Sequence, residues 1–255
     1  MEEQPFVGGN FSDATRVGDT VRRRSRPWTP TVHAVLRFLR ANGFDAAPEP
    51  LGFDERGREV LRFIEGDTHV GWPVPLPDWI YDEEVLVASA RLLRRFHDLS
   101  RSFIAPADAK WQLPAPTPHE VLCHHDWAPY NAVFSGTRPI AMLDWDMCGP
   151  GSRAWDVARV AFVWVPLNPA DERYQLDEKA ARLRMLCDAY GLDDRHGLIE
   201  LLARQLRFSA DYAEAQARLG DPGWMKLAAW DVPARSRSDA DRLTEQQRVL
   251  ESELA

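Results

Sequence analysis

Short runs in which apolar and polar residues alternate dominate the first 66 residues of the chain. The run from Thr15 to Arg23 is interrupted at Gly18-Asp19, which favours a β-hairpin with its turn at that point. A second hairpin is predicted from Leu51 to Ile64, with its turn at residues 55–57. Between the hairpins, apolar residues recur at helical spacing over residues 30–42, and Gly43 is suited to end that helix.

The pattern changes after Gly66, where prolines at 73, 75 and 77 interrupt the alternation. Helical spacing then predicts one helix from Asp82 to Leu99 and further helices over 154–165, 171–190, 195–219 and 239–254. Short apolar runs predict strands over residues 121–124, 132–134 and 140–145. We therefore expect an α+β protein with a small, β-rich N-terminal lobe (1–66) and a mostly helical C-terminal lobe (67–255).

The composition narrows the classes of partner. The formal net charge is −8, and the longest basic run is three arginines, so a nucleic-acid partner is not expected. An acidic chain could instead accept a cationic small molecule. No apolar stretch is long enough to span a bilayer, and three cysteines without zinc spacing indicate reduced thiols in the cytoplasm. The oligomeric state is left open.

Candidate chemistry is concentrated between Leu122 and Asp156. Asp126 follows a predicted strand, Asn131 precedes the next strand, and Asp144 lies near the end of the strand after that. A hairpin of this length brings both of its ends to one edge, so the three oxygen-bearing side chains are predicted to converge.

Such a set suits magnesium and phosphate. Mg²⁺ prefers a few carboxylate or amide oxygens and takes its other ligands from phosphates and water. Phosphoryl transfer also needs an aspartate to orient the acceptor hydroxyl. Taken singly, Asp126, Asn131 and Asp144 are ordinary turn or strand-edge residues, but their order and spacing together favour a site.

The pattern His124-x-Asp126-x-x-x-x-Asn131, followed by an apolar strand and Asp144-Trp145-Asp146, resembles the aminoglycoside phosphotransferase and choline kinase family. The resemblance implies a protein-kinase-like fold with two lobes. It further implies that Asp126 is the catalytic base, that His124 supports the catalytic loop, and that Asn131 and Asp144 bind Mg²⁺. Asp146 and Asp156 would hold that loop from behind. His125 stands where the family usually has glycine.

The same resemblance predicts an ATP site in the small lobe, with GTP as the alternative donor. The segment from Glu59 to Gly66 would be the last strand and hinge, and Ile64 and Glu65 would meet the base. The family has a lysine on the third strand and a glutamate on the next helix, but this lobe has no lysine and residues 30–42 no glutamate. Arg23 is the predicted substitute for the lysine. Residues 8–12 are the only candidate for a glycine-rich loop.

Three alternatives or open points remain. His124 and His125 could suggest zinc together with His97 or His119, but adjacent histidines on a strand point apart. Immunity proteins against the peptide antibiotic trifolitoxin also resemble this fold, so a non-catalytic binding role is the rival to a small-molecule phosphotransferase. The acceptor, expected near the C-terminal helices, is not specified. Acidic residues there that could attract a cation are Asp171, Glu172, Asp177, Asp211 and Glu214.

Overall fold

The computed structural model describes residues 3–6, 14–71, 74–169 and 171–254. Contacts divide the chain into two compact units, residues 1–153 and 154–255. The first unit contains every β-strand and the second unit is helical, which confirms the α+β class for the described residues. The predicted lobe boundary after Gly66 lies inside the first unit and stays a prediction.

A five-stranded antiparallel sheet opens the first unit, in the order β1-β2-β3-β5-β4. Both predicted hairpins are present, as β2–β3 and β4–β5, although β5 ends two residues earlier than expected. The strands are β1 (Gln4–Pro5), β2 (Thr15–Val17), β3 (Thr20–Arg23), β4 (Pro50–Phe53) and β5 (Glu59–Arg62).

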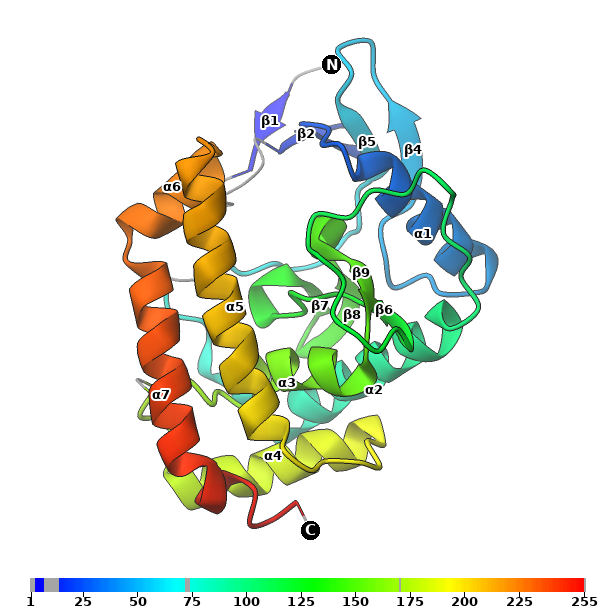
Figure 1. The fold of residues 1–255 in the computed structure, drawn as a ribbon. Coiled ribbons are helices and arrows are strands. Elements are labelled where there is room, and N and C mark those ends of the chain that lie inside the picture. Colours follow the sequence, from blue (N-terminus) through cyan, green and yellow to red (C-terminus); the bar gives the residue numbers. More distant parts are fainter. Residues whose placement is uncertain (1–2, 7–13, 72–73, 170, 255) are drawn as a thin grey trace. The chain divides into compact units, whose positions relative to one another are not determined.

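Helix α1 (Thr29–Ala41) connects the two hairpins and lies beside β4 (Figure 1). Its buried face follows the predicted spacing, with Val32, Val35 and Leu39 almost fully inaccessible. Pro30 occupies the first turn, where the missing amide proton is not needed, and Gly43 adopts a positive φ of 79° just after the C-cap.

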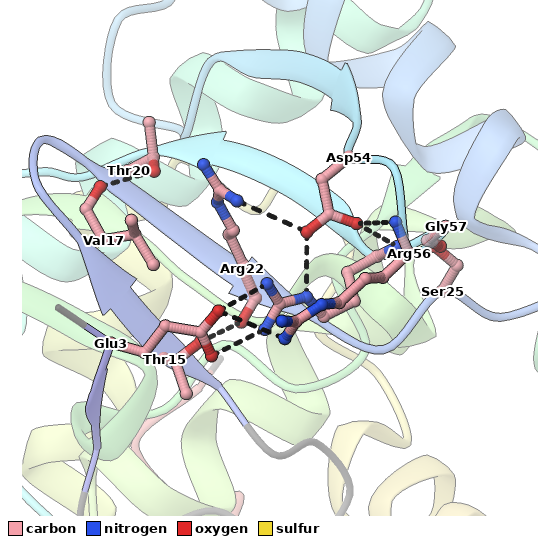
Figure 2. A network of polar contacts seen from close by, with 10 residues as sticks. Glu3, Thr15, Val17, Thr20, Arg22, Ser25, Asp54, Arg56 and Gly57 are labelled. Carbon is pink, nitrogen blue, oxygen red and sulfur yellow. Dashed lines mark hydrogen bonds and ion pairs between the residues drawn. The ribbon is translucent and has the colours of Figure 1, made fainter. Parts of the chain in front are cut away.

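A polar network ties the N-terminal residues to the β4–β5 turn (Figure 2). Asp54 accepts hydrogen bonds from the backbone amides of Arg56 and Arg58 and from the side chain of Arg58. Arg58 in turn contacts Glu3 at 2.9 and 3.1 Å, and Arg22 of β3 contacts Asp54 at 3.5 Å. The Arg22 side chain therefore contacts the β4–β5 turn, and its neighbour Arg23 projects from the other face of β3.

The rest of the first unit includes α2 (Glu83–Ser100), two small antiparallel strand pairs and short 3-10 helices. The strand pair β7–β8 was predicted, and its register in the structure places Ala132 opposite Met142. The pairing of β6 with β9 was not predicted, because the Gly-Pro-Gly sequence of β9 carries no strand signal. These strands are β6 (Val121–Cys123), β7 (Ala132–Ser135), β8 (Arg138–Met142) and β9 (Gly149–Gly151).

The segment that follows β5 pairs with β7 directly after Gly66. Asp67 and Phe134 exchange two backbone hydrogen bonds, of 2.8 and 2.9 Å. A Cβ atom at Gly66 would lie 2.5 Å from the Phe134 carbonyl oxygen, and φ is 146° there. Only glycine fits this position without a shift of the backbone.

The second unit contains α3, α4 and a helical group in which α5 packs against both α6 and α7 (Figure 1). Helix α6 was not predicted, because Pro222-Gly223 resembles a turn. The helices are α3 (Arg153–Trp164), α4 (Leu176–Tyr190), α5 (Leu198–Arg218), α6 (Pro222–Ala229) and α7 (Val232–Leu250).

Two general expectations can be compared with the fold directly. Cys123, Cys148 and Cys187 are buried and free of disulfides, as predicted for core thiols. In the part of the chain that the structure describes, we find no helix with both the length and the hydropathy to span a bilayer.

Candidate active site

The segment between β6 and β7 carries the first two candidate residues. Asp126 lies three positions beyond the end of β6, and Asn131 ends a short 3-10 helix that leads into β7. The side-chain amide of Asn131 donates to the Asp126 carboxylate at 2.8 Å and to its backbone carbonyl at 2.9 Å. Tyr130 donates to the other carboxylate oxygen at 3.4 Å. Asp126 is thus held in place from two sides.

Asp144 is brought beside this segment by the β7–β8 pair. The amide of Leu143 donates to the backbone carbonyl of Asn131 at 2.8 Å, which continues the pairing by one residue. Asp144 then leaves the strand with a left-handed backbone, φ 58° and ψ 67°. Asp126, Asn131 and Asp144 therefore lie on adjoining segments, as the hairpin argument predicts, while their chemical roles stay predictions.

The two histidines before Asp126 differ in their roles: His124 accepts a hydrogen bond from the loop, and His125 has an unusual backbone conformation. His124 is fully buried against Trp145, with 4.8 Å between ring centroids, and its Nδ1 accepts a hydrogen bond from the Asp126 amide at 3.3 Å. That contact is consistent with support of the loop. His125 adopts a positive φ of 63°, a region that glycine enters most readily. The glycine expected from the family resemblance therefore has a conformational reason.

Arg23 is the focus of the polar cluster. Its side chain is 9% exposed and contacts three carboxylates. Nε donates to Glu59, Nη1 to Asp144 at 3.2 Å, and Nη2 to Asp146 at 2.8 Å. The structure thus links the sheet residue that we expect to replace the lysine directly to the predicted metal ligand Asp144.

The acid paired with Arg23 comes from the sheet. Glu59 of β5 is directly opposite Arg23 of β3, and its other carboxylate oxygen lies 3.2 Å from Nε2 of His33 on α1. Burial by itself would raise the pKa of Glu59, but the hydrogen bond from His33 and the charge of Arg23 hold that pKa below its usual value. Glu59 is therefore a buried carboxylate that stays ionised.

Negative charge exceeds positive charge in this cluster. Burial raises the pKa of Asp146 to about 6, Arg23 opposes the rise, and the carboxylates of Asp144 and Glu59 add to it. The same three acids raise the pKa of Arg23 although burial lowers it. Three carboxylates thus share one guanidinium. Excess negative charge and oxygen donors fit a divalent cation such as Mg²⁺.

The two residues after β5 that we expect to contact a nucleotide are more exposed than Arg23. Glu65 is exposed and pairs with Arg16 at 3.0 Å, and Ile64 is half-buried one position before it. The guanidinium of Arg16 also lies over the ring of Phe63 at 3.6 Å. The Glu65 side chain is therefore paired with Arg16 of the sheet. Contact of Ile64 and Glu65 with a nucleotide stays a prediction. The glycine-rich candidate at 8–12 lies outside the described residues.

Two residues of the cluster were not predicted as members of the site, Glu59 and His33. The signal for Glu59 was present, because it alternates with Leu61 on the buried face of its strand, where an acid needs a partner. The identity of that partner depends on strand register, which the sequence does not specify.

Comparison with known proteins adds an independent line of evidence. Residues 103–201 match a family described as the phosphotransferase enzyme family. The chain is 32% identical over 268 residues to a trifolitoxin immunity protein from Rhizobium leguminosarum bv. trifolii, with 100% of this chain and 99% of that protein covered.

Solved structures resemble the whole chain. A choline/ethanolamine kinase family protein from Mesorhizobium loti superposes with a TM-score of 0.62 at 16% identity, covering 100% of this chain and 93% of that one. An amicoumacin kinase in complex with AMP-PNP and Ca²⁺ gives a TM-score of 0.66 at 10% identity, covering 94% and 88%. The fold is therefore the protein-kinase-like fold that the resemblance implied.

Proposed function

This chain belongs to the phosphotransferase enzyme family, and from that membership we propose that it transfers the γ-phosphoryl group of ATP to a hydroxyl of a small polar molecule. The observation that carries the proposal is the arrangement of Asp126, Asn131 and Asp144 on adjoining segments. These residues correspond in type and order to what phosphoryl transfer to an alcohol requires.

Asp126 orients the acceptor and takes its proton. Asn131 and Tyr130 donate hydrogen bonds to its carboxylate, which fixes the direction of the remaining lone pairs. A hydroxyl that donates to this carboxylate is aligned for attack on the γ-phosphorus. As its oxygen bonds to that phosphorus, the bond to the β,γ-bridging oxygen breaks and ADP leaves, and the hydroxyl proton passes to a carboxylate oxygen of Asp126.

Asn131 and Asp144 would hold Mg²⁺. The amide nitrogen of Asn131 is engaged by Asp126, which leaves its side-chain oxygen as the metal ligand. When bound, the cation neutralises charge on the transferring phosphoryl group. Asp144 would exchange its contact with Arg23 for the metal, and Arg23 would then be available to the phosphates of the nucleotide.

The acceptor class is less closely defined than the donor. Three of the acids expected to attract a cation are engaged elsewhere: Asp211 and Glu214 pair with Arg237 at 2.7 Å, and Asp171 pairs with Arg173 at 3.0 Å. The helical unit thus offers less unbalanced negative charge than the sequence indicated. We propose an antibiotic-like acceptor, since an amicoumacin kinase shares the fold and the full-length relative is an immunity protein.

A second function is favoured by one specific observation. The relative that is 32% identical over its whole length is a trifolitoxin immunity protein. A chain that protects by sequestering a peptide antibiotic would keep the fold and would not require turnover. Phosphoryl transfer requires the carboxylate of Asp126, whereas sequestration does not.

The Asp126→Asn variant separates them. It keeps the shape and removes the proton acceptor, so it should bind Mg²⁺-nucleotide normally and lose about 10²-fold or more in turnover. Protection of cells can be scored against a panel of aminoglycosides, macrolides and peptide antibiotics, with the exposed Asp108→Asn as control. Full protection by Asp126→Asn against a compound that the parent protein neutralises would contradict the catalytic proposal for that compound.

A further inference from the structure

Arg23 and Glu59 form an ion pair that the sheet itself assembles. The two residues are directly opposite each other in the β3–β5 register, and both are buried. Their contact joins Nε of the guanidinium to one oxygen of the carboxylate. The two terminal nitrogens of Arg23 then point to Asp144 and Asp146. The direction of the guanidinium is therefore set by a residue on the adjacent strand.

Helix α1 contributes a histidine to this pair and no acid. His33 is 1% exposed, stacks on Phe53 with 5.1 Å between ring centroids, and lies 3.2 Å from the second oxygen of Glu59. Glu59 thus has one oxygen on Arg23 and the other on His33. With both oxygens engaged, its carboxylate has little freedom to rotate.

We propose that Glu59 and His33 act together as positioning residues for Arg23, so that the acid of the nucleotide site stands on β5 and the helix supplies the group that orients it. The assignment to a nucleotide site rests on the proposed function. The positioning itself rests on the contacts that Glu59 makes with Arg23 and His33.

This arrangement has a mechanical consequence. An acid carried on a helix meets its cation only when the helix is suitably placed. Glu59 and Arg23 stand on neighbouring strands that are joined by backbone hydrogen bonds, so their meeting does not require a residue of α1. Arg23 should accordingly remain aimed at Asp144 in the absence of any ligand.

The first measurement follows the Arg23 Nε–H proton by NMR in the nucleotide-free protein. We expect slow exchange with solvent in the wild type and exchange faster by about tenfold or more in Glu59→Gln, which weakens the charge-assisted hydrogen bond. Glu49→Gln is the matched control, because Glu49 also pairs with sheet and helix arginines but is more exposed. Equal protection in wild type and Glu59→Gln would overturn the proposal.

The second measurement is the affinity for ADP without metal, by calorimetry. Glu59→Gln should bind about tenfold more weakly than wild type, while Glu49→Gln should be within about twofold. Adding His33→Glu to Glu59→Gln returns a carboxylate to the pair from the helix side, and should recover most of the lost affinity and proton protection. A double variant no better than Glu59→Gln would mean that Glu59 is only structural.

Two outcomes are kept distinct. If wild type binds no ADP although the Nε–H proton is protected through Glu59, the proposed function fails and the positioning role stands. If Glu59→Gln does not fold, His33→Phe carries the test, because it keeps the stacking on Phe53 and removes only the hydrogen bond to Glu59. Unchanged Arg23 exchange in that variant would overturn the part assigned to His33.

Discussion

Two residues in or next to the candidate site have left-handed backbones, His125 at φ 63° and Asp144 at φ 58°. Aspartate and histidine enter this region more often than most residues, although it is uncommon for any residue other than glycine. His125 is nevertheless 7% exposed and well packed. The loop that carries Asp126 thus begins with a conformation that the packing around His125 maintains.

The backbone at His125 gives a prediction about stability. His125→Val places a β-branched residue at positive φ and should destabilise the protein by about 1–3 kcal/mol more than His125→Gly does, since glycine accepts that φ without strain. Urea denaturation of both variants gives the difference directly. Each loses the imidazole, so the pair isolates the backbone effect. Equal stabilities would show that His125 is not strained.

At the scale of single residues, the sequence indicates which residues gather at the site better than it indicates which of them form ion pairs with one another. The order of Asp126, Asn131 and Asp144 was enough to predict their proximity, and alternation along β3 pointed to Arg23, whose place in a nucleotide site stays a prediction. Glu59 was not identified, because a cross-strand partner depends on which residue faces which across the sheet. The link from Arg23 to Asp146 was missed for a related reason, as it joins residues 123 positions apart.

Elements with strong periodicity were predicted well, and those whose composition opposes their structure were not. Helix α1, helix α2 and four of the five strands in the large sheet follow from alternation or helical spacing. Helix α6 begins with Pro222-Gly223, a pair typical of turns, yet Asp221 caps it by accepting hydrogen bonds from the amides of Gly223 and Trp224. Helix α7 starts at Val232, seven residues before the predicted start.

The packing of α7 on α5 supports a prediction for the helical unit. Leu243 is fully buried on α7, so Leu243→Ala should lower the free energy of unfolding by about 2–5 kcal/mol through lost burial and the cavity left behind. Glu245→Ala, on the exposed side of the same helix, should change it by less than about 0.5 kcal/mol. Thermal unfolding of the three proteins checks this, and a Leu243→Ala protein as stable as Glu245→Ala would contradict the packing.

For the whole molecule, the division into two compact units assigns the expected site residues to one of them. Arg23, Glu65, Asp126, Asn131 and Asp144 all lie within residues 1–153. This unit carries both the sheet that provides the guanidinium and the hairpin that provides the oxygen donors. The sequence indicated a change of character after Gly66, whereas the compact division falls after Arg153. Helix α1 contacts α2, and Arg23 pairs with Asp144, so elements on both sides of Gly66 belong to one unit.

Ligand linkage of the complete chain provides a test of the metal site. A ligand that binds only the folded state stabilises it, by about 2.7 kcal/mol at a concentration 100 times its Kd. Mg²⁺ should therefore increase the rise in Tm that ADP produces in the wild type. Asp144→Asn should keep the effect of ADP and lose the further effect of Mg²⁺, while Asp108→Asn should behave as the wild type. A Mg²⁺ effect that survives in Asp144→Asn would remove Asp144 from the metal site.

The pairing of Arg23 with Glu59 also bears on folding fidelity. Three consecutive arginines, Arg22 to Arg24, give β3 no hydrophobic preference at its end, so side-chain hydrophobicity alone does little to choose between neighbouring alignments there. A slip by one residue would turn Arg23 to the opposite face and leave the buried acid of β5 facing a different arginine. In the native alignment Arg23 meets Glu59 while its neighbour Arg22 reaches Asp54, and a slip that put Arg22 opposite Glu59 would put Val21 in the place of Arg22 and lose the contact with Asp54. The two contacts thus disfavour that slip, and residues that prepare the site also help the chain to find its fold.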